Sequence, residues 1–316
     1  MAKKNPSITA PYFHDDDKAR KYLESVRWPN GPFCPHCGVE GGDPIKTGKD
    51  TVRKDGRVQK ARQGLYRCAQ KECRQQFSVT VGTVFERSHI PLSKWLMAAY
   101  LLCSSKKGIS SHQLHRTLGV TYKTAWFLSH RIRHAMASPV GLMGTGGAVV
   151  EADETYIGNK GGKPKRAGHG HKHTVFALVE RGGKVKSTHI FGPGKTTDGI
   201  KKALRVVSPD AQMMTDDARW YRGILAGYDH ESVNHSKGEY VRGNVHTNTI
   251  EGVFSIFKRG MVGTYQHCGE QHLQRYLSEF DFRYNHRASI GLDDMERTRD
   301  ALRGIEGKRL TYRKLG

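Results

Sequence analysis

The segment His246–Lys258, HTNTIEGVFSIFK, is the stretch from which the fold of the C-terminal half can be worked out. It opens with polar residues that suit the start of a helix and continues in an amphipathic pattern. Four apolar side chains fall on one side of this predicted helix: Ile250, Val253, Phe254 and Phe257. Glu251 and Lys258 are seven residues apart. That separation is about two helical turns, so both side chains project from the same face.

Glu251 admits two interpretations. A lone glutamate on the polar stripe of a helix is most simply a solvated charge. A functional role is favoured by Asp153 and Asp216, because each of them stands at the end of an apolar, strand-like run.

The charge of the chain indicates a polyanionic partner. Among 316 residues there are 52 Lys and Arg against 30 Asp and Glu, which gives a net charge of +22 and a pI of about 9.8. An excess of this size is typical of proteins that bind nucleic acid. The opening residues MAKKNPS lack an apolar core and no long apolar run follows. We therefore expect no signal peptide, no membrane span, and a cytoplasmic, nucleoid-associated location.

Four of the six cysteines form two spaced pairs that predict a structural zinc site. Two residues separate Cys34 from Cys37, four separate Cys68 from Cys73, and the pairs are 31 positions apart. Two such knuckles can supply four thiolates to one tetrahedral zinc, with an apparent binding energy on the order of 10–16 kcal/mol. Four unrelated buried thiols are the alternative, and the paired spacing disfavours it. The basic segment 46–64 between the pairs is predicted to be a loop or a hairpin tip.

The pattern before residue 140 is otherwise helical. Residues 13–26 predict a short helix with an acidic first turn, and Pro91 begins an apolar helix that we expect to be buried. A turn at Gly119 then separates two further helices, which is the helix-turn-helix pattern. The candidate DNA contacts are Thr121, Tyr122 and Lys123 at the front of the recognition helix, and Arg131 and Arg133 at phosphates.

From residue 148 onward the pattern changes to strands. Residues 148–158 predict a strand, and residues 173–192 predict a hairpin that turns at Gly182 and Gly183. The later elements are helix 195–207, strand 211–217, helix 218–226, strand 228–236, the Glu251 helix and helix 271–287. This order predicts an α/β RNase H-like domain. Asp153 would lie on its central strand and Asp216 on the strand beside it.

Three acids that converge in this way have a chemical use. Carboxylate oxygens bind Mg²⁺ or Mn²⁺, and two such ions can clamp the attacking and leaving oxygens of a phosphodiester exchange. In a chain with a net charge of +22, an acidic cluster is more easily explained by phosphoryl chemistry on nucleic acid than by structure. We therefore predict that Asp153, Asp216 and Glu251 hold a catalytic divalent metal.

The segments VEADETYIG, MMTDDARWY, HTNTIEGVFSIFKRG and YLSEFDFRYNHR resemble the DDE transposases of bacterial insertion sequences. RWPNGPFCPHCG and TAWFLSHRIRHAM are similar to the ISXO-like group, which carries an N-terminal zinc ribbon. The resemblance covers nearly the whole chain. It implies that Asp153, Asp216 and Glu251 are catalytic and that Lys258 assists by contacting DNA.

Some members of the group are described with Asn as the third catalytic residue, and Asn248 stands one turn before Glu251. We favour Glu251, because a carboxylate binds a hard cation better than an amide does. Asp217 and Glu154 adjoin the predicted acids, and we expect their side chains to point to the opposite side of their strands.

The resemblance also implies a reaction and its partners. Water would cleave the ends of the element, and the freed 3′-hydroxyl would then attack target DNA. Double-stranded DNA, as terminal inverted repeats and target, is the expected partner, bound by a homo-oligomer. A DNA-binding protein that no longer cuts, and an RNase H-type nuclease, are the alternative functions.

The predicted organisation has four parts: a helix and zinc ribbon at 1–82, a helix-turn-helix domain at 83–140, a catalytic domain at 146–290 and a basic tail at 291–316. The basic, glycine-rich loop 159–173 could be a solvated tip or a DNA contact. Its histidines, His169, His171 and His173, could also bind a transition metal.

Overall fold

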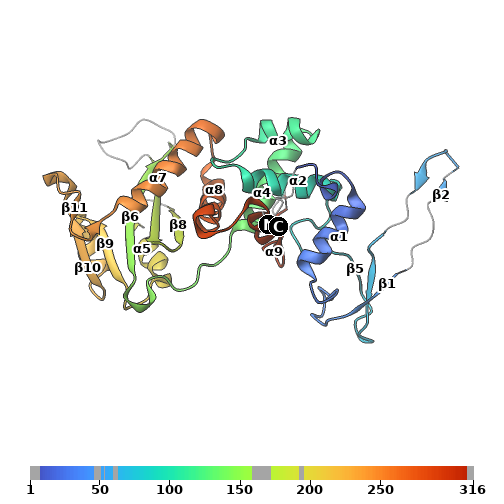
Figure 1. Cartoon of the computed structure of the whole chain (residues 1–316), viewed down its shortest axis with the longest axis horizontal. Helices are drawn as coiled ribbons and strands as arrows, with labels where there is room; N and C mark the ends of the chain where they lie inside the picture. Colours follow the sequence, from blue (N-terminus) through green and yellow to red (C-terminus); the bar gives the residue numbers. More distant parts are fainter. Residues whose placement is uncertain are drawn as a thin grey trace, which may run out of the picture. The chain divides into compact units, whose positions relative to one another are not determined.

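The computed structural model describes residues 8–45, 51–52, 54–59, 63–158, 172–191 and 196–311 (Figure 1). They form two compact units. Unit 1 contains the described residues up to Ser104, Ser111–Met136 and those from Asp293 onward, and unit 2 contains Ser105–Ser110 and Ala137–Leu292. Within the described ranges, no helix is long and apolar enough to cross a membrane.

Unit 1 begins with α1 (Asp16–Arg27), which Asp15 caps by accepting a hydrogen bond from the main-chain N of Lys18. The expected buried helix is α2 (Leu92–Ser104), whose Trp95, Leu96 and Leu102 are almost fully buried. Asp16 Oδ1 accepts hydrogen bonds from Ser93 N and Oγ at 3.0 and 2.6 Å. The acidic first turn predicted from the sequence therefore fixes the start of α2 as well.

The zinc-ribbon region of unit 1 is built from short strands. β1 (Gly42–Pro44), β4 (Tyr66–Cys68) and β5 (Gln76–Phe77) form an antiparallel sheet with β4 in the centre. Between them, β2 (Thr51–Val52) and β3 (Val58–Gln59) pair as a hairpin, where the sequence predicted a loop or a hairpin tip. Residues 46–50, 53 and 60–62 of that segment lie outside the described residues.

Two helices with a tight turn follow at the predicted position. α3 (Ser111–Leu118) and α4 (Tyr122–Met136) are joined through Gly119, whose φ of 58° is left-handed and suits glycine.

The C-terminal segment corrects one prediction. Residues 291–316 were expected to be a basic tail, but they contain α9 (Asp294–Arg303), which packs on α2, α1 and α4. Met295, Ala301 and Leu302 are buried on its inner face. The predicted parts 1–82 and 83–140 also share unit 1 rather than forming separate units.

Unit 2 is built on a mixed sheet of five strands in the order β10-β9-β6-β7-β8. β6 (Val149–Ile157), β7 (His173–Glu180) and β8 (Val185–Ile190) are antiparallel, and the β7–β8 turn contains Gly182 with a φ of 72°. β9 (Gln212–Asp216) runs parallel to β6, and β10 (Asp229–Val233) runs parallel to β9. This arrangement is compatible with the RNase H-like fold.

Helices cover both faces of this sheet (Figure 1). On one face, α5 (Thr196–Ala203) and α6 (Arg219–Ile224) share an apolar cluster with Val150 and Ala152 of β6. On the other, α7 (Asn248–Gly260) and α8 (Glu270–Asn285) pack on alternate residues of β7. The four predicted apolar residues of α7 are buried there. Because strand side chains alternate between faces, Glu151 and Asp153 point toward the α7 side.

The edge strand β8 is covered by polar side chains of α8. Gln274, Asp281 and Asn285 accept hydrogen bonds from the main-chain N of His189, Ser187 and Val185, at 2.8, 2.7 and 2.7 Å. A covered edge cannot pair with another chain.

The smaller elements complete the description. A hairpin of β11 (Val241–Arg242) and β12 (Val245–His246), which the sequence did not predict, precedes α7. A π-helical turn, Met261–Tyr265, follows it. Short 3₁₀ helices span Pro11–Phe13, Thr145–Gly147, Leu204–Val206, His235–Lys237 and Ala288–Ile290.

Candidate active site

The sheet register brings Asp153 and Asp216 toward each other. β6 and β9 are paired from Val149 opposite Gln212 to Glu151 opposite Met214, and there the pairing ends. The same register continued by two residues sets Asp153 opposite Asp216, on the face that α7 covers. The two carboxylates therefore stand where the strands have stopped hydrogen-bonding to each other.

Electrostatics indicates that Asp153 lies close to the other two predicted acids. Burial, and then the negative charges of Glu154, Asp216 and Glu251, raise the pKa of Asp153 to about 8. A hydrogen bond from the main-chain N of Glu154 to Asp153 Oδ1, at 2.7 Å, opposes that shift. A cation among these carboxylates would relieve the repulsion that disfavours their ionised forms.

A pocket of about 410 Å³ opens between β6 and α7. Its lining residues are Asp153, Glu154, Thr155, Glu251, Phe254, Ser255, Lys258 and Arg259. Glu251 and Lys258 thus share a face with Asp153, as the helical spacing predicted. Asn248, the alternative to Glu251, is the exposed first residue of α7 and does not line the pocket.

The two neighbouring acids, one of which also lines the pocket, have hydrogen-bond partners of their own. Glu154 Oε2 accepts a hydrogen bond of 2.6 Å from Tyr221 Oη, and Tyr221 belongs to the cluster on the α5–α6 face. Burial raises the pKa of Glu154 to about 7. Asp217 Oδ2 accepts a hydrogen bond of 2.5 Å from Asn234 Nδ2. That neither residue is catalytic stays a prediction.

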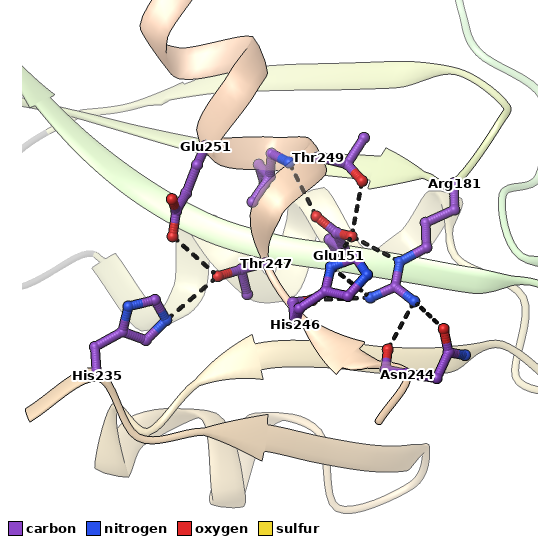
Figure 2. A network of polar contacts seen from close by, with 9 residues as sticks. Glu151, Arg181, His235, Asn244, His246, Thr247, Thr249 and Glu251 are labelled. Atoms are coloured by element: carbon purple, nitrogen blue, oxygen red, sulfur yellow. Dashed lines mark hydrogen bonds and ion pairs between the residues drawn. The ribbon is translucent and has the colours of Figure 1, made fainter. Parts of the chain in front are cut away.

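A further carboxylate on β6, Glu151, holds the start of α7 (Figure 2). Its side chain is fully buried. Arg181 Nε and Thr249 Oγ1 donate to Glu151 Oε1 at 2.7 and 2.9 Å, and the main-chain N of Ile250 donates to Oε2 at 2.9 Å. The first main-chain N–H groups of a helix lack partners within the helix. Glu151 therefore caps α7 from the neighbouring strand.

Arg181 extends this network to the chain that leads into α7. Its two terminal nitrogens donate to the carbonyl oxygens of Asn244 and His246 at 2.8 and 2.9 Å (Figure 2). Arg181 thus ties β6, the β7–β8 turn and the entry to α7 together, through one hydrogen bond to Glu151 and others to Asn244 and His246. The carboxylate of Glu251 is fixed relative to β6 by this connection.

Glu251 itself has one side-chain contact in the same view. Thr247 Oγ1 donates to Glu251 Oε1 at 3.3 Å and lies 3.4 Å from His235 Nε2 (Figure 2). Thr247 is buried, whereas Glu251 is exposed and can meet a ligand in the pocket.

Sequence reasoning did not single out Glu151 or Arg181. The signal that was available is the alternation in VEADE, which sets Glu151 and Asp153 on one face of the strand. The sequence patterns also did not identify Arg259 and Ser255 of α7, which line the pocket beside the predicted Glu251 and Lys258.

The four predicted cysteines form one cluster in unit 1. The sulfur atoms of Cys34 and Cys73 are 3.8 Å apart, those of Cys37 and Cys68 are 3.5 Å apart, and all four lie within 4.8 Å of one another. Four thiolates at about 2.3 Å from a tetrahedral zinc are roughly 3.8 Å from each other. The donor set and its spacing fit a structural zinc ion.

The residues predicted to contact DNA fall into two groups. Thr121, Tyr122 and Lys123 are exposed at the start of α4, and Thr121 Oγ1 accepts a hydrogen bond from the main-chain N of Thr124. Arg131 and Arg133 are 6% and 1% exposed, so the prediction that they contact phosphates is wrong for this fold.

Their internal contacts explain the burial. Arg131 donates to the carbonyl oxygen of Glu86 and lies over the ring of Trp95, and Arg133 donates to Ser129 Oγ.

Comparisons with known proteins agree with this architecture. Residues 143–285 match the family described as ISXO2-like transposase domain, and residues 14–76 match the transposase zinc-ribbon domain. An uncharacterized protein in transposable element ISH50 of Halobacterium salinarum is 30% identical over 294 residues, covering 86% of this chain and 91% of that protein.

One solved structure is similar at a low level: a simian T-cell lymphotropic virus intasome in complex with PP2A regulatory subunit B56 gamma. The match has 13% identity and a TM-score of 0.27, and it covers 53% of this chain and 63% of that chain. A likeness this weak supports no conclusion about the present fold.

The sheet, the acids and the cysteine cluster, together with these matches, define a transposase of the insertion-sequence type. The chain belongs to the ISXO2-like DDE transposases that carry an N-terminal zinc ribbon.

Proposed function

We propose that this transposase binds the terminal inverted repeats of its insertion sequence, cleaves the DNA strands at their ends and joins the freed ends to target DNA. The observation that carries the proposal is the convergence of Asp153, Asp216 and Glu251 from β6, β9 and α7. Such crowding of carboxylates beside a cationic helix face has a use in phosphodiester chemistry and is costly without a cation.

The three carboxylates fit a divalent metal ion. All three offer hard oxygen donors, and the pKa of about 8 for Asp153 reflects negative charges that a cation would balance. When bound, Mg²⁺ or Mn²⁺ supplies Lewis-acid activation of the attacking oxygen and stabilisation of the leaving oxygen.

The chain's own groups bind and orient the DNA end. Lys258 and Arg259 line the pocket beside Glu251, and their charges would attract the phosphate next to the scissile bond. Glu151 and Arg181 act as positioning residues, because they fix the start of α7 and thereby Glu251.

In this proposal, unit 1 recognises the DNA sequence of the repeat. The zinc-loaded ribbon and the exposed start of α4, with Thr121, Tyr122 and Lys123, would recognise the repeat. Joining two ends of one element requires both to be held at once, so we propose a homo-oligomer on DNA.

The test uses the inverted repeats that flank the chain's own gene, with full-length zinc-loaded protein and Mg²⁺ present or absent. We expect repeat binding, Mg²⁺-dependent strand cleavage and strand transfer. Glu251→Gln should abolish cleavage while binding persists, and Asn248→Ala should cleave nearly normally. The reverse pattern would make Asn248 the third catalytic residue.

Two other outcomes would overturn the proposal. Specific binding without cleavage would indicate a DNA-binding protein that has lost catalysis. Cleavage without strand transfer would indicate a nuclease of the RNase H type.

A further inference from the structure

Two histidines and a glutamate meet in unit 2 apart from the pocket of the three acids. His173 begins β7, His189 lies on β8 and Glu270 is the first residue of α8. Glu270 Oε1 is 3.4 Å from His173 Nδ1 and 3.9 Å from His189 Nε2. One donor atom from each residue lies within 4.8 Å of the other two.

The sheet register explains why these side chains converge. His189 is paired with Val175, and His173 precedes Val175 by two residues, so both imidazoles project from one face of the sheet. Val175 packs with α7 and α8, so this is the face that α8 covers. The main-chain N of His189 donates to Gln274 Oε1 one turn into α8, which holds the helix start against this point.

Both imidazoles of this cluster are deeply buried. His173 is 6% exposed and His189 is 3% exposed. Nδ1 of His173 is buried and makes no hydrogen bond to any other described residue, although Glu270 Oε1 is 3.4 Å away. Buried polar atoms are nearly always satisfied, so an imidazole nitrogen aimed at a carboxylate calls for a proton or a cation. Two imidazolium ions around one carboxylate would leave a buried excess of positive charge, which is unfavourable.

We propose that His173, His189 and Glu270 bind one transition-metal ion, Zn²⁺, in addition to the zinc of the cysteine cluster. Two imidazole nitrogens and one carboxylate oxygen are a donor set that suits Zn²⁺ and does not suit Mg²⁺. Donors of a tetrahedral zinc with bonds of about 2.0–2.1 Å are roughly 3.3 Å apart. The distances of 3.4 and 3.9 Å are close to that value, and small side-chain rotations close the remainder.

Solvent can deliver the ion and complete its coordination. The side chain of Glu270 is 41% exposed, so one side of the cluster is open to water. A site with three protein ligands keeps a fourth position for a water molecule. The ion would join β7, the edge strand β8 and the start of α8, and would therefore stabilise unit 2.

The proposal is tested by metal analysis of the full-length protein after Zn²⁺ saturation and removal of free metal, with excess Mg²⁺ present to occupy the carboxylate pocket. We expect two zinc equivalents per chain. Glu270→Gln changes a half-exposed side chain without changing its size, and it should weaken the second equivalent at least about tenfold. His189→Ala should remove it. The matched control is His267→Ala, because His267 is an exposed imidazole three residues before Glu270.

Two further measurements separate this site from the zinc ribbon. A Cys34→Ser, Cys37→Ser variant should lose the thiolate-to-metal charge-transfer band of the Co²⁺-substituted protein and still bind one equivalent. Zn²⁺ should raise the thermal midpoint of this cysteine variant, and Glu270→Gln in the same background should abolish that rise. Wild-type protein that saturates at one equivalent, or a Glu270→Gln variant that binds both equivalents with unchanged affinity, would overturn the assignment.

Discussion

Glu151 and Asp153 are two carboxylates on one face of one strand, two residues apart, and their surroundings differ in kind. Glu151 is fully buried, and Arg181, Thr249 and the main-chain N of Ile250 donate to it. Asp153 accepts a hydrogen bond from the main chain and otherwise faces other acids, and its pKa is raised to about 8. Both are withdrawn from water, but within the described ranges only Glu151 forms an ion pair with a cation.

This difference separates the part of β6 that holds the fold together, at Glu151, from the part that we propose for catalysis, at Asp153. The charge of Glu151 is balanced by Arg181, and the pair positions the start of α7. Among the described residues no cation pairs with Asp153 in this way, so we expect ionisation at that position to depend on a bound metal ion. The predictions below vary the partners of these carboxylates one at a time.

The largest effect is expected for Asp153→Asn. The amide has the same shape but is a poor ligand for a hard cation, so cleavage should fall at least about ten-thousandfold, or more than about 5 kcal/mol in activation free energy. Folding should be retained, because the change removes an ionisable group whose charged form is disfavoured. Single-turnover cleavage and urea unfolding measure the two quantities. A variant that cleaves normally would remove Asp153 from the catalytic set.

The next effect is expected for Arg181→Met, which leaves the Glu151 carboxylate buried without its cation. Breaking a buried pair from one side costs about 3–5 kcal/mol, and urea unfolding should show a loss of that size. The double variant Glu151→Gln, Arg181→Met removes both charges and serves as the control. It should recover part of the lost stability. If it does not, packing of the arginine rather than its charge holds α7.

The sheet and the three acids could be predicted from the sequence because they depend on local patterns. Alternation gives the face of Asp153, and helical spacing gives the shared face of Glu251 and Lys258. The Glu151–Arg181 pair could not be predicted in the same way. Its partners are 30 residues apart in the chain and meet only after the β6–β7 register is set. Periodicity identifies a face but not the partner on it.

Two misassignments in unit 1 have related causes. Arg131 and Arg133 were counted as DNA-facing cations, yet α4 is buried on most sides, and no charge count reveals which arginines are internal. The segment 291–316 was judged by its charge. It contains a capping box, Asp293 with Glu296, at the start of a helix that buries Met295, Ala301 and Leu302, and that signal was present in the sequence.

A third buried carboxylate, Asp281, lies between Glu151 and Asp153 in character, because it has hydrogen-bond donors but no partner cation among the described residues. Asp281 accepts hydrogen bonds from Ser187 N and Oγ at 2.7 and 2.6 Å, and it makes no ion pair with any described residue. Burial raises its pKa from 3.8 to about 6. The folded state therefore holds this proton more tightly than the unfolded state. The stabilisation that the protonated Asp281 adds to the free energy of unfolding is fully present below about pH 4 and is lost as pH rises through 6.

We expect Asp281→Asn to remove the loss of stability that accompanies deprotonation of Asp281. The unfolding free energy of the variant relative to wild type should rise between pH 4 and 7, by up to about 3 kcal/mol. Urea unfolding at a series of pH values measures the difference, and any constant effect of the amide on hydrogen bonding cancels in the slope. A difference that does not change with pH would mean that Asp281 is ionised in the folded state throughout this range.

The smallest effects concern the exposed cations, which extend the contrast from acids to bases. Lys258 lines the pocket and Lys123 begins α4, whereas Arg131 and Arg133 are internal. Lys123→Ala should lower affinity for the repeat and reduce the salt slope of log K by about 0.9, the value for one neutralised phosphate. Lys258→Ala should instead reduce single-turnover cleavage by about tenfold, or about 1.4 kcal/mol, with little loss of affinity.

The control for both lysine variants is Lys201→Ala, an exposed lysine on α5 across the sheet from α7. It should change neither cleavage nor the salt slope, since the pocket opens on the other face of the sheet. Binding measured over a salt series, together with cleavage of fully bound DNA, separates effects on repeat recognition from effects on strand cleavage. Equal losses in both quantities for Lys123→Ala and Lys258→Ala would mean that one continuous surface grips the DNA. The assignment of repeat recognition to unit 1 and of strand cleavage to the pocket in unit 2 would then be wrong.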